Sequence, residues 1–341
     1  MNVLVGHESV LGLLERSARV KRPAHAYVFT GLDGIGKKMA AVRFACLLNC
    51  PDPTADPHGS CPVCSRIRAQ THPDFLVEKP ERGMIRIDRI RYLKNFLRYP
   101  PAEGTWRIVV IDDAHLMNRA AQNAILKTLE EPPAGRMVIL VTSKPHLLLS
   151  TVRSRCRHIG FGPIALETLA EFLQQEKGMS PEKSWILAGM GCGSISQALE
   201  MDTPSLSRLR EQMISTLSDP GSSGIRGLIE LSAHISSDRK RVSDAIHIAL
   251  TWIQDLLRAS VPNDHSTVIN SDFAERIRDI SSRYSVDQMF RVYDEILNGS
   301  ELIESDINVN RNLIIDIMFL RIARILVGPD LGTAPAEALR S

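Results

Sequence analysis

Short continuous apolar runs, each followed by a segment of helical character, dominate the first 160 residues. The runs that are typical of buried strands are 24–31, 106–112 and 137–142. The segments that favour helices, by composition or by apolar spacing, are 37–49, 85–99 and 119–130. Proline pairs at 100–101 and 132–133 stop the last two of these helices. Buried strands that alternate with helices predict a parallel sheet covered on both faces.

The pattern changes beyond residue 164, where the strand signals disappear. Residues 164–203 show short helical periods. From 205 to 327 the pattern is helical, with breaks at 219–224 and near 261–264. The remainder, 328–341, is predicted to be a mobile tail. An α/β domain followed by helical domains is therefore expected.

Composition and charge narrow the class of protein. The chain has 341 residues, of which 44% are hydrophobic, and its net charge is 41 − 39 = +2. That length suggests two or three domains. No run reaches about 18 uncharged apolar residues, and the N-terminus does not resemble a secretory signal. We therefore expect a soluble cytoplasmic protein with no membrane segment. The balanced charge argues against a protein that coats nucleic acid by itself.

The turn after the first predicted strand, GLDGIGKK, has the spacing of a phosphate-binding loop. Gly31, Gly34 and Gly36 would let backbone N–H groups approach phosphates, and Lys37 would reach the β- and γ-phosphates. Lys38 stands where a Ser or Thr hydroxyl normally ligates Mg²⁺, and its ammonium would repel a cation. ATP and Mg²⁺ are therefore expected to bind weakly or not at all.

Polar residues also follow the other two predicted strands. Asp112 and Asp113 come at the end of the second strand, where such a pair usually supplies a Mg²⁺ ligand and a water-orienting acid. Asp112 fits the first role, whereas Asp113 replaces a longer Glu and would fall short of the second. Capping of the next element is the alternative for both acids. Thr142, at the end of the third strand, could touch a γ-phosphate.

A basic turn, TVRSRCR at 151–157, follows the third strand. An arginine on a tight turn can reach out of its own subunit and stabilise the charge that develops during phosphoryl transfer. A solvated basic turn is the alternative interpretation.

Four motifs in this order resemble the AAA+ clamp-loader subunits of bacterial DNA polymerase III. They are GxxGxGK at 31–37, VVIDDAH at 109–115, LKTLEEPP at 126–133 and SRC at 154–156. The chain looks most like the delta-prime members, in which the phosphate loop and acid pair are typically degraded while SRC is kept. The match is good over 1–160, fair over 161–205, and rests on 308–313 in the last third.

The resemblance implies a fold in three parts. These are an α/β AAA+ P-loop domain with a parallel sheet at 1–160, a small helical lid domain at 161–205, and an all-α collar domain at 206–327 that joins subunits together.

The resemblance also implies a function. It points to a non-motor, stator-like clamp-loader subunit that helps load the sliding clamp onto primed DNA and has no ATPase activity of its own. Arg155, by its place in SRC, would act in trans on ATP bound to a neighbour. Its partners would be the tau/gamma and delta subunits, with the clamp and DNA met through the complex. The alternative is an ATP-hydrolysing motor subunit or another AAA+ remodelling ATPase. Lys38, Asp113 and the absence of an arginine from 193–196 weigh against it.

Subunits of this type often insert a structural zinc module, here at about 50–74, that ends in an HPD-like turn. Cys50, Cys61 and Cys64 match its spacing, and His58 stands where the second cysteine is expected. Three thiolates and one imidazole form a normal closed zinc site, which disfavours a zinc enzyme. Cys46 is the rival fourth ligand, and metal-free cysteines are the remaining alternative.

Overall fold

The computed structural model describes residues 4–20, 23–51, 61–130, 133–236, 238–261, 268–304 and 310–327. These residues form two compact units. The first comprises Met1–Leu169 with Gly193–Ser196, and the second comprises Ala170–Cys192 with Gln197–Ser341. The predicted zinc ligand His58 and the predicted tail at 328–341 lie outside the described residues. The domain boundaries near 160 and 205 remain predictions.

The first unit is built on a five-stranded sheet whose pairs are all parallel, in the order β2-β3-β4-β1-β5. The strands are β1 (Ala26–Thr30), β2 (Phe75–Glu78), β3 (Arg107–Ile111), β4 (Arg136–Thr142) and β5 (Arg157–Gly160). The three predicted strands are confirmed as β1, β3 and β4. The two edge strands were not predicted, because each has four residues and β5 buries only Ile159.

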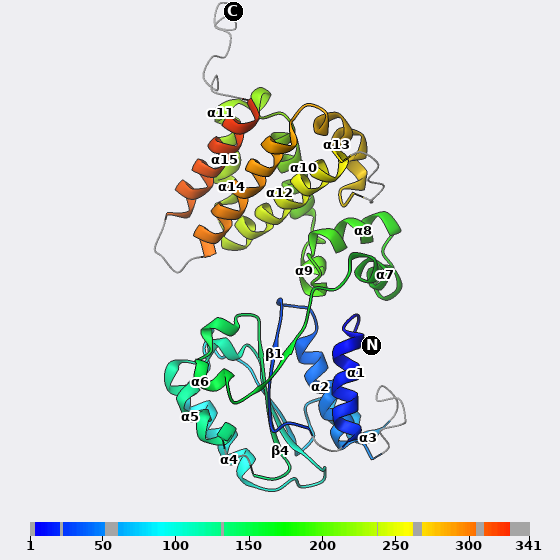
Figure 1. Ribbon diagram of the computed structural model, residues 1–341, viewed down its shortest axis with the longest axis vertical. Helices are drawn as coiled ribbons and strands as arrows, with labels where there is room; N and C mark the ends of the chain where they lie inside the picture. Colours follow the sequence, from blue (N-terminus) through cyan, green and yellow to red (C-terminus); the bar gives the residue numbers. More distant parts are fainter. Residues whose placement is uncertain are drawn as a thin grey trace, which may run out of the picture. The chain divides into compact units, whose positions relative to one another are not determined.

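Helices cover both faces of this sheet (Figure 1). They are α1 (Glu8–Arg19), α2 (Lys37–Asn49), α3 (Pro62–Arg68), α4 (Ile87–Arg98), α5 (Arg119–Glu130) and α6 (Ser150–Arg153), with the short 3₁₀ turns η1 (Ala114–Leu116) and η2 (Pro145–Leu147). The first three lie on one face and the last three α-helices on the other. The predicted helices at 37–49, 85–99 and 119–130 are confirmed as α2, α4 and α5.

Alternate residues of the strands supply the two halves of the core. On one face, Tyr27 and Phe29 pack with Phe44 of α2. On the other, Val28 packs in one cluster with Ile125 of α5. Each large apolar side chain that is fully buried contributes roughly 1.5–3 kcal/mol. Because helices pack against both faces of the sheet, the ends of its strands are held at fixed positions.

The second unit is helical. Its helices are α7 (Leu166–Lys177, whose first turn belongs to the first unit), α8 (Pro181–Met190), α9 (Ile195–Glu200, which begins in the first unit), α10 (Pro204–Ser218), α11 (Pro220–Ile235), α12 (Arg239–Ala259), η3 (Ser271–Phe273), α13 (Ala274–Ser281), α14 (Val286–Glu304) and α15 (Arg311–Val327). α12 packs against α10, α13 and α14, and α15 packs against α11 and α14. Among the described residues, none of the helices is both long and apolar enough to cross a membrane.

One predicted break is narrower than the sequence indicated. The helical pattern was expected to be interrupted at 219–224, but α10 ends at Ser218 and α11 begins at Pro220. Proline is well suited to the first position of a helix, because the N–H that it lacks has no partner there. The glycines and serines that suggested a loop therefore lie in the first turns of α11.

Candidate functional site

The carboxyl ends of β1, β3 and β4 bring the predicted nucleotide-site residues to one edge of the sheet. β1 runs into the loop 31–36, β3 runs into Asp112, and β4 ends at Thr142. Ligands of parallel sheets bind at this edge. The sequence-predicted residues found there are Gly31, Gly34, Gly36, Lys37, Lys38, Asp112, Asp113 and Thr142.

Lys38 forms an ion pair with the acid that would hold a metal. Its Nζ lies 2.8 Å from Oδ2 of Asp112, and neither side chain is more than one-third exposed. A Mg²⁺ ion bound at this edge would need the same carboxylate. The ammonium of Lys38 therefore competes with a metal for Asp112, which goes beyond the predicted loss of a hydroxyl ligand.

Lys37 is turned into its own loop. Its Nζ donates to the carbonyl oxygen of Gly31 at 3.0 Å and to that of Leu32. The side chain is buried, and burial lowers the pKa of Lys37 despite the nearby charges of Asp33 and Asp113. The ammonium is thus satisfied by carbonyl groups of its own loop.

Thr142 and Asp113 are also engaged within the chain. Thr142 is fully buried, its Oγ1 lies 3.1 Å from Nδ1 of His115, and it accepts the N–H of Lys144 at 3.0 Å. Asp113 adopts a left-handed conformation with φ +47° and does not cap η1 with its side chain. Burial, followed by the charge of Asp112, raises the pKa of Asp113.

Sequence analysis did not assign the residues that close over the loop. A side chain at Gly34 would place its Cβ 2.5 Å from Cβ of Ser196 and 2.6 Å from Oγ of Ser194. On another side of the loop, His7 Nε2 lies 3.0 Å from the carbonyl oxygen of Ile35. The glycine-rich sequence around residue 193 indicated a turn but not its contact with the loop. The phosphate loop is therefore held by other parts of the first unit.

The SRC turn presents Arg155 between two buried anchors. Val152 and Cys156 are both buried in the core beneath α5 and α6. The side chain of Arg155 is 35% exposed. Its Nε and Nη2 contact Oε1 of Glu130 at 2.8 and 2.6 Å, and its Nη1 donates to the carbonyl oxygen of Thr151 at 2.9 Å. The turn thus holds an accessible guanidinium on a rigid base.

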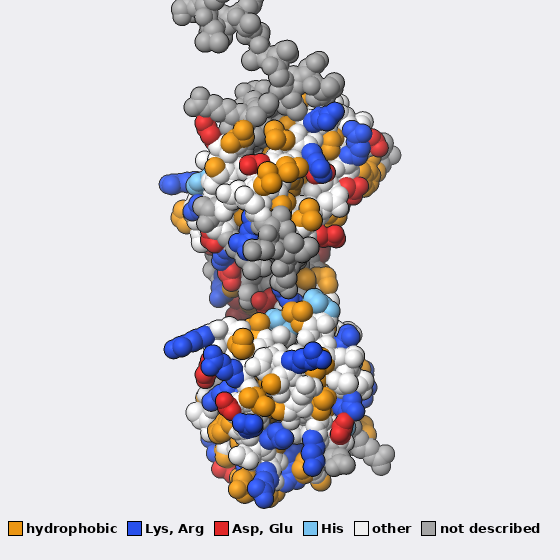
Figure 2. All heavy atoms as spheres, turned by 90° about the vertical axis from the view of Figure 1, so that its left-hand side faces the viewer, with side chains coloured by type: hydrophobic (Ala, Val, Ile, Leu, Met, Phe, Trp, Pro, Cys, Tyr) orange, Lys and Arg blue, Asp and Glu red, His pale blue; other side chains and the backbone are white. Residues whose placement is uncertain are grey.

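The face of the first unit that carries α4, α5 and α6 is positively charged. Figure 2 shows many Lys and Arg side chains and few acidic ones over this side of the unit. Helix α4 carries a single acidic residue, Asp88, and four basic residues, Arg89, Arg91, Lys94 and Arg98. A positive field of this kind favours the approach of anionic partners.

Cys50, Cys61 and Cys64 converge at the other face of the sheet, where α2 ends and α3 begins. Their sulfur atoms all lie within 4.8 Å of one another, and those of Cys50 and Cys61 are 3.8 Å apart. Zinc–sulfur bonds of about 2.3 Å at tetrahedral angles separate two sulfurs by roughly 3.8 Å. The three cysteines therefore fit a zinc ion.

Cys46 is arranged differently from these three cysteines. It is buried, and its thiol points to the carbonyl oxygen of Cys64 at 3.8 Å. Cys46 does not belong to the group of three cysteines whose sulfur atoms lie within 4.8 Å of one another. The geometry thus separates Cys46 from the cluster.

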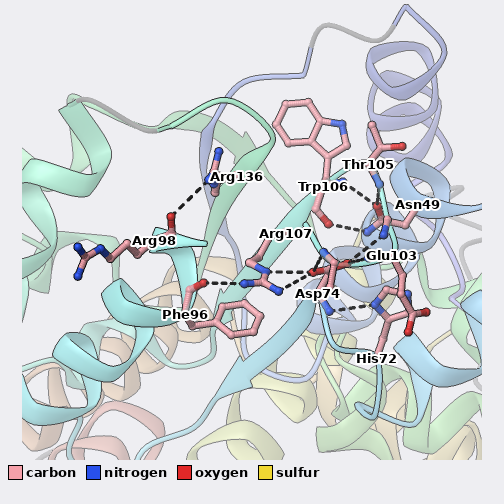
Figure 3. Close-up of polar contacts among 12 residues, drawn as sticks. Asn49, His72, Asp74, Phe96, Arg98, Glu103, Thr105, Trp106, Arg107 and Arg136 are labelled. Atoms are coloured by element: carbon pink, nitrogen blue, oxygen red, sulfur yellow. Dashed lines mark hydrogen bonds and ion pairs between the residues drawn. The ribbon is translucent and has the colours of Figure 1, made fainter. Parts of the chain in front are cut away.

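A buried polar cluster, drawn in Figure 3, ties both ends of the cysteine-rich segment to one loop. Asp74 is fully buried, accepts the backbone N–H groups of residues 102–104 at 2.7–2.9 Å, and pairs with Arg107 at 2.9 Å. Asn49 bonds the backbone of residues 105–106 at 2.8–2.9 Å. Sequence analysis placed Asp74 only in an HPD-like turn. We call Asp74, Arg107 and Asn49 the polar hub.

Replacing Arg107 by alanine is expected to lower the free energy of unfolding by about 3–5 kcal/mol, because it leaves the buried Asp74 carboxylate without its charged partner. Arg66→Ala is the matched control. It removes the exposed ion pair with Glu103, and pairs of that kind contribute about 0–1 kcal/mol. Denaturant unfolding followed by circular dichroism measures both. Equal losses for the two variants would contradict the importance of the polar hub.

The carboxylate of Asp74 is expected to make the free energy of unfolding depend on pH. Burial alone would raise the pKa of Asp74, but the N–H groups of residues 102–104 and the Arg107 guanidinium outweigh it and lower the pKa to about 2. An unfolded Asp titrates near 3.9, so the stabilisation is complete above about pH 4 and is lost as the pH falls through 2. An acid unfolding series should show this loss, and Asp74→Asn should reduce it.

Two family models match the chain and together span most of it. One, described as "DNA polymerase III, delta subunit", matches residues 6–165. The other, described as "DNA polymerase III, delta subunit, C terminal", matches residues 205–324.

Three named proteins are similar to this chain. The DNA polymerase III subunit delta' of Pseudomonas aeruginosa is 28% identical over 318 residues, covering 90% of this chain and 93% of that protein. The DNA polymerase III subunit tau of Bacillus subtilis is 32% identical over 208 residues, covering 58% of this chain and 36% of that protein. A solved structure of a gamma subunit-related protein from Thermotoga maritima is 20% identical and covers 91% of this chain and 98% of that one, with a TM-score of 0.39.

Both halves of the chain are thus matched by models of one kind of subunit, and the delta' relative is matched over nearly its whole length. The sheet with its P-loop-like edge and the helical C-terminal part have the arrangement expected of an AAA+ clamp-loader protein. The chain belongs to the delta-prime family of DNA polymerase III clamp-loader subunits.

Proposed function

We propose that this chain is the non-motor, stator-like subunit of its clamp loader and that it presents Arg155 in trans to ATP on a neighbouring subunit. In this way it would help load the sliding clamp onto primed DNA. The observation that carries the proposal is the 2.8 Å ion pair between Lys38 and Asp112. A subunit that hydrolyses ATP would use that carboxylate for Mg²⁺.

The acid pair supports the same assignment. Asp113 stands where a longer Glu usually orients the attacking water, and its carboxylate would fall short of that role.

Arg155 has the properties that a residue acting on a neighbour requires. It is accessible, and its backbone is fixed by the buried Val152 and Cys156. A planar guanidinium can form two parallel hydrogen bonds to phosphate oxygens. The ATP would be bound by the tau/gamma partner, the delta subunit would complete the complex, and the helical region 206–327 would serve as the collar.

We also propose that the cysteine cluster holds a structural zinc ion. Cys50, Cys61 and Cys64 would supply three thiolates, and His58 would supply the fourth ligand. Such a closed site leaves no open position for catalysis. The ion would fasten the end of α2 to the start of α3, and Arg155 would act independently of it.

The purified chain is expected to turn over no ATP above the buffer background, because its Mg²⁺ carboxylate is paired with Lys38. Lys37→Ala should leave this baseline unchanged. A phosphate-release assay at saturating Mg²⁺ and ATP measures both, with the ATP-hydrolysing partner subunit as the positive control. A clear turnover that Lys37→Ala abolishes would instead identify a motor subunit.

A further inference from the structure

We propose that Glu130, the last residue of α5, is a positioning residue that holds the guanidinium of Arg155 with two of its N–H groups left for phosphate. This inference rests on the proposed trans role of Arg155. It concerns a side chain of the LKTLEEPP motif that the proposed function does not otherwise use.

The hydrogen bonds of Arg155 account for only part of its donor capacity. A guanidinium carries five N–H donors. Glu130 Oε1 accepts from Nε and forms an ion pair with Nη2 at 2.6 Å, and the carbonyl oxygen of Thr151 accepts from Nη1. Within the described residues these contacts leave at least one N–H on each terminal nitrogen. Two such donors on adjacent nitrogens match the bidentate geometry by which arginine binds phosphate.

The location of Glu130 is unfavourable for the helix that carries it. Carboxylates near the C-terminus of a helix are opposed by the helix dipole, typically by 0.3–1 kcal/mol. Glu130 is the final residue of α5 and is exposed. The ion pair with Arg155 is a favourable contact that offsets this cost.

Glu130 and Arg155 are both adjacent to residues of the same buried cluster. Leu129, the neighbour of Glu130, is buried in one cluster with Val152 and Cys156, which flank Arg155. The carbonyl group of Leu129 is also bonded to Nε2 of His25 at 3.0 Å. The distance between the end of α5 and the arginine turn is therefore fixed by packing, and Glu130 restricts the one part of Arg155 that could still rotate.

If the side chain of Arg155 is held in place before the neighbouring subunit binds, we expect an effect on kcat for ATP hydrolysis rather than on the affinity for ATP. A free arginine must be ordered in the transition state, which costs conformational entropy. We expect Glu130→Ala to lower kcat for ATP hydrolysis in the reconstituted complex by about tenfold, roughly the effect of ordering one long side chain. KM for ATP should change by less than about threefold, because Arg155 would act on the transition state rather than on ATP binding.

The test uses the full complex of this chain with its ATP-hydrolysing partners, the clamp and primed DNA. Four proteins are compared in it: wild type, Glu130→Ala, Arg155→Ala and the double variant. Glu130→Gln keeps an oxygen that can accept from Nε, so it should retain most of the rate. Glu103→Ala is the matched control, since it breaks an equally exposed ion pair of the same unit, with Arg66, and should leave kcat unchanged.

The outcomes separate this inference from the function on which it rests. The double variant should be no slower than Arg155→Ala alone, because Glu130 acts only through Arg155. If Arg155→Ala has no effect, the proposed function itself is wrong. If Arg155→Ala slows hydrolysis but Glu130→Ala does not, or if the two losses multiply in the double variant, the positioning role is overturned. Gel filtration and melting curves of each variant establish that assembly and folding are intact.

Discussion

Arg155→Ala is expected to slow ATP hydrolysis at the adjacent subunit of a reconstituted clamp loader by about 10³-fold or more. Arginine fingers supplied in trans stabilise the charge that develops on the transferred phosphoryl group, and they typically accelerate the reaction by 10³–10⁵. Because this chain pairs its own Mg²⁺ carboxylate with Lys38, the loss would come from the neighbour's site. Arg155→Lys should restore little, since an ammonium lacks the planar fork.

Single-turnover hydrolysis with the clamp and primed DNA present measures this effect directly. Arg157→Ala is the matched control, because Arg157 is an exposed arginine two residues further along the chain, at the start of β5. It should leave the rate within about twofold of wild type, as expected for a residue that is not a finger. Assembly must be checked by gel filtration. Wild-type hydrolysis by an assembled Arg155→Ala complex would rule out the trans role.

Cys64→Ser is expected to abolish zinc binding, from about one equivalent per chain to nearly none. Cys64 is buried in the first turn of α3, so its removal leaves an incomplete ligand set in the core of the site. Structural zinc contributes of order 10–16 kcal/mol to the folding of isolated zinc modules, and most of that contribution depends on a full tetrad. Metal analysis of the purified protein, with α3 followed by hydrogen exchange, measures both consequences.

The identity of the fourth ligand is tested by two further variants. His58→Ala should weaken zinc retention against a chelator, whereas Cys46→Ala should retain near-stoichiometric metal. The expectation for Cys46 follows from its position, since its thiol contacts a backbone carbonyl group rather than the other sulfurs. Zinc that persists in His58→Ala but is absent from Cys46→Ala would reverse the assignment.

Sequence patterns predicted the parts of the fold that have strong local signals. The strands β1, β3 and β4 are continuous apolar runs, so burial on both faces is visible in the sequence. The edge strand β5 reads RHIG and has a single buried residue, which leaves no such pattern. The convergence of Cys50, Cys61 and Cys64 was predicted in another way, from the resemblance to clamp-loader subunits, whose zinc module has this spacing.

Contacts between distant segments could not be predicted in the same way. Sequence alone indicates that Lys38 cannot be a Mg²⁺ ligand, because an ammonium does not coordinate a cation. Its ion pair with Asp112, however, depends on how α2 packs against β3. The pair between Glu130 and Arg155 depends similarly on the packing of α5 against the SRC turn. Local residue patterns carry no information about such distances, which tertiary packing decides.

The polar hub has a consequence for how this protein can vary. Asn49 stands just before the cysteine-rich insertion and Asp74 is at its end, and both hold the backbone of residues 102–106. The ends of the insertion are thus fixed independently of what lies between them. Lengthening a flexible segment between fixed ends costs only about 0.6 kcal/mol for each doubling of its length. The insertion can therefore vary in length, provided that α3 still supplies Cys64 and Ile67 to the core on this face of the sheet.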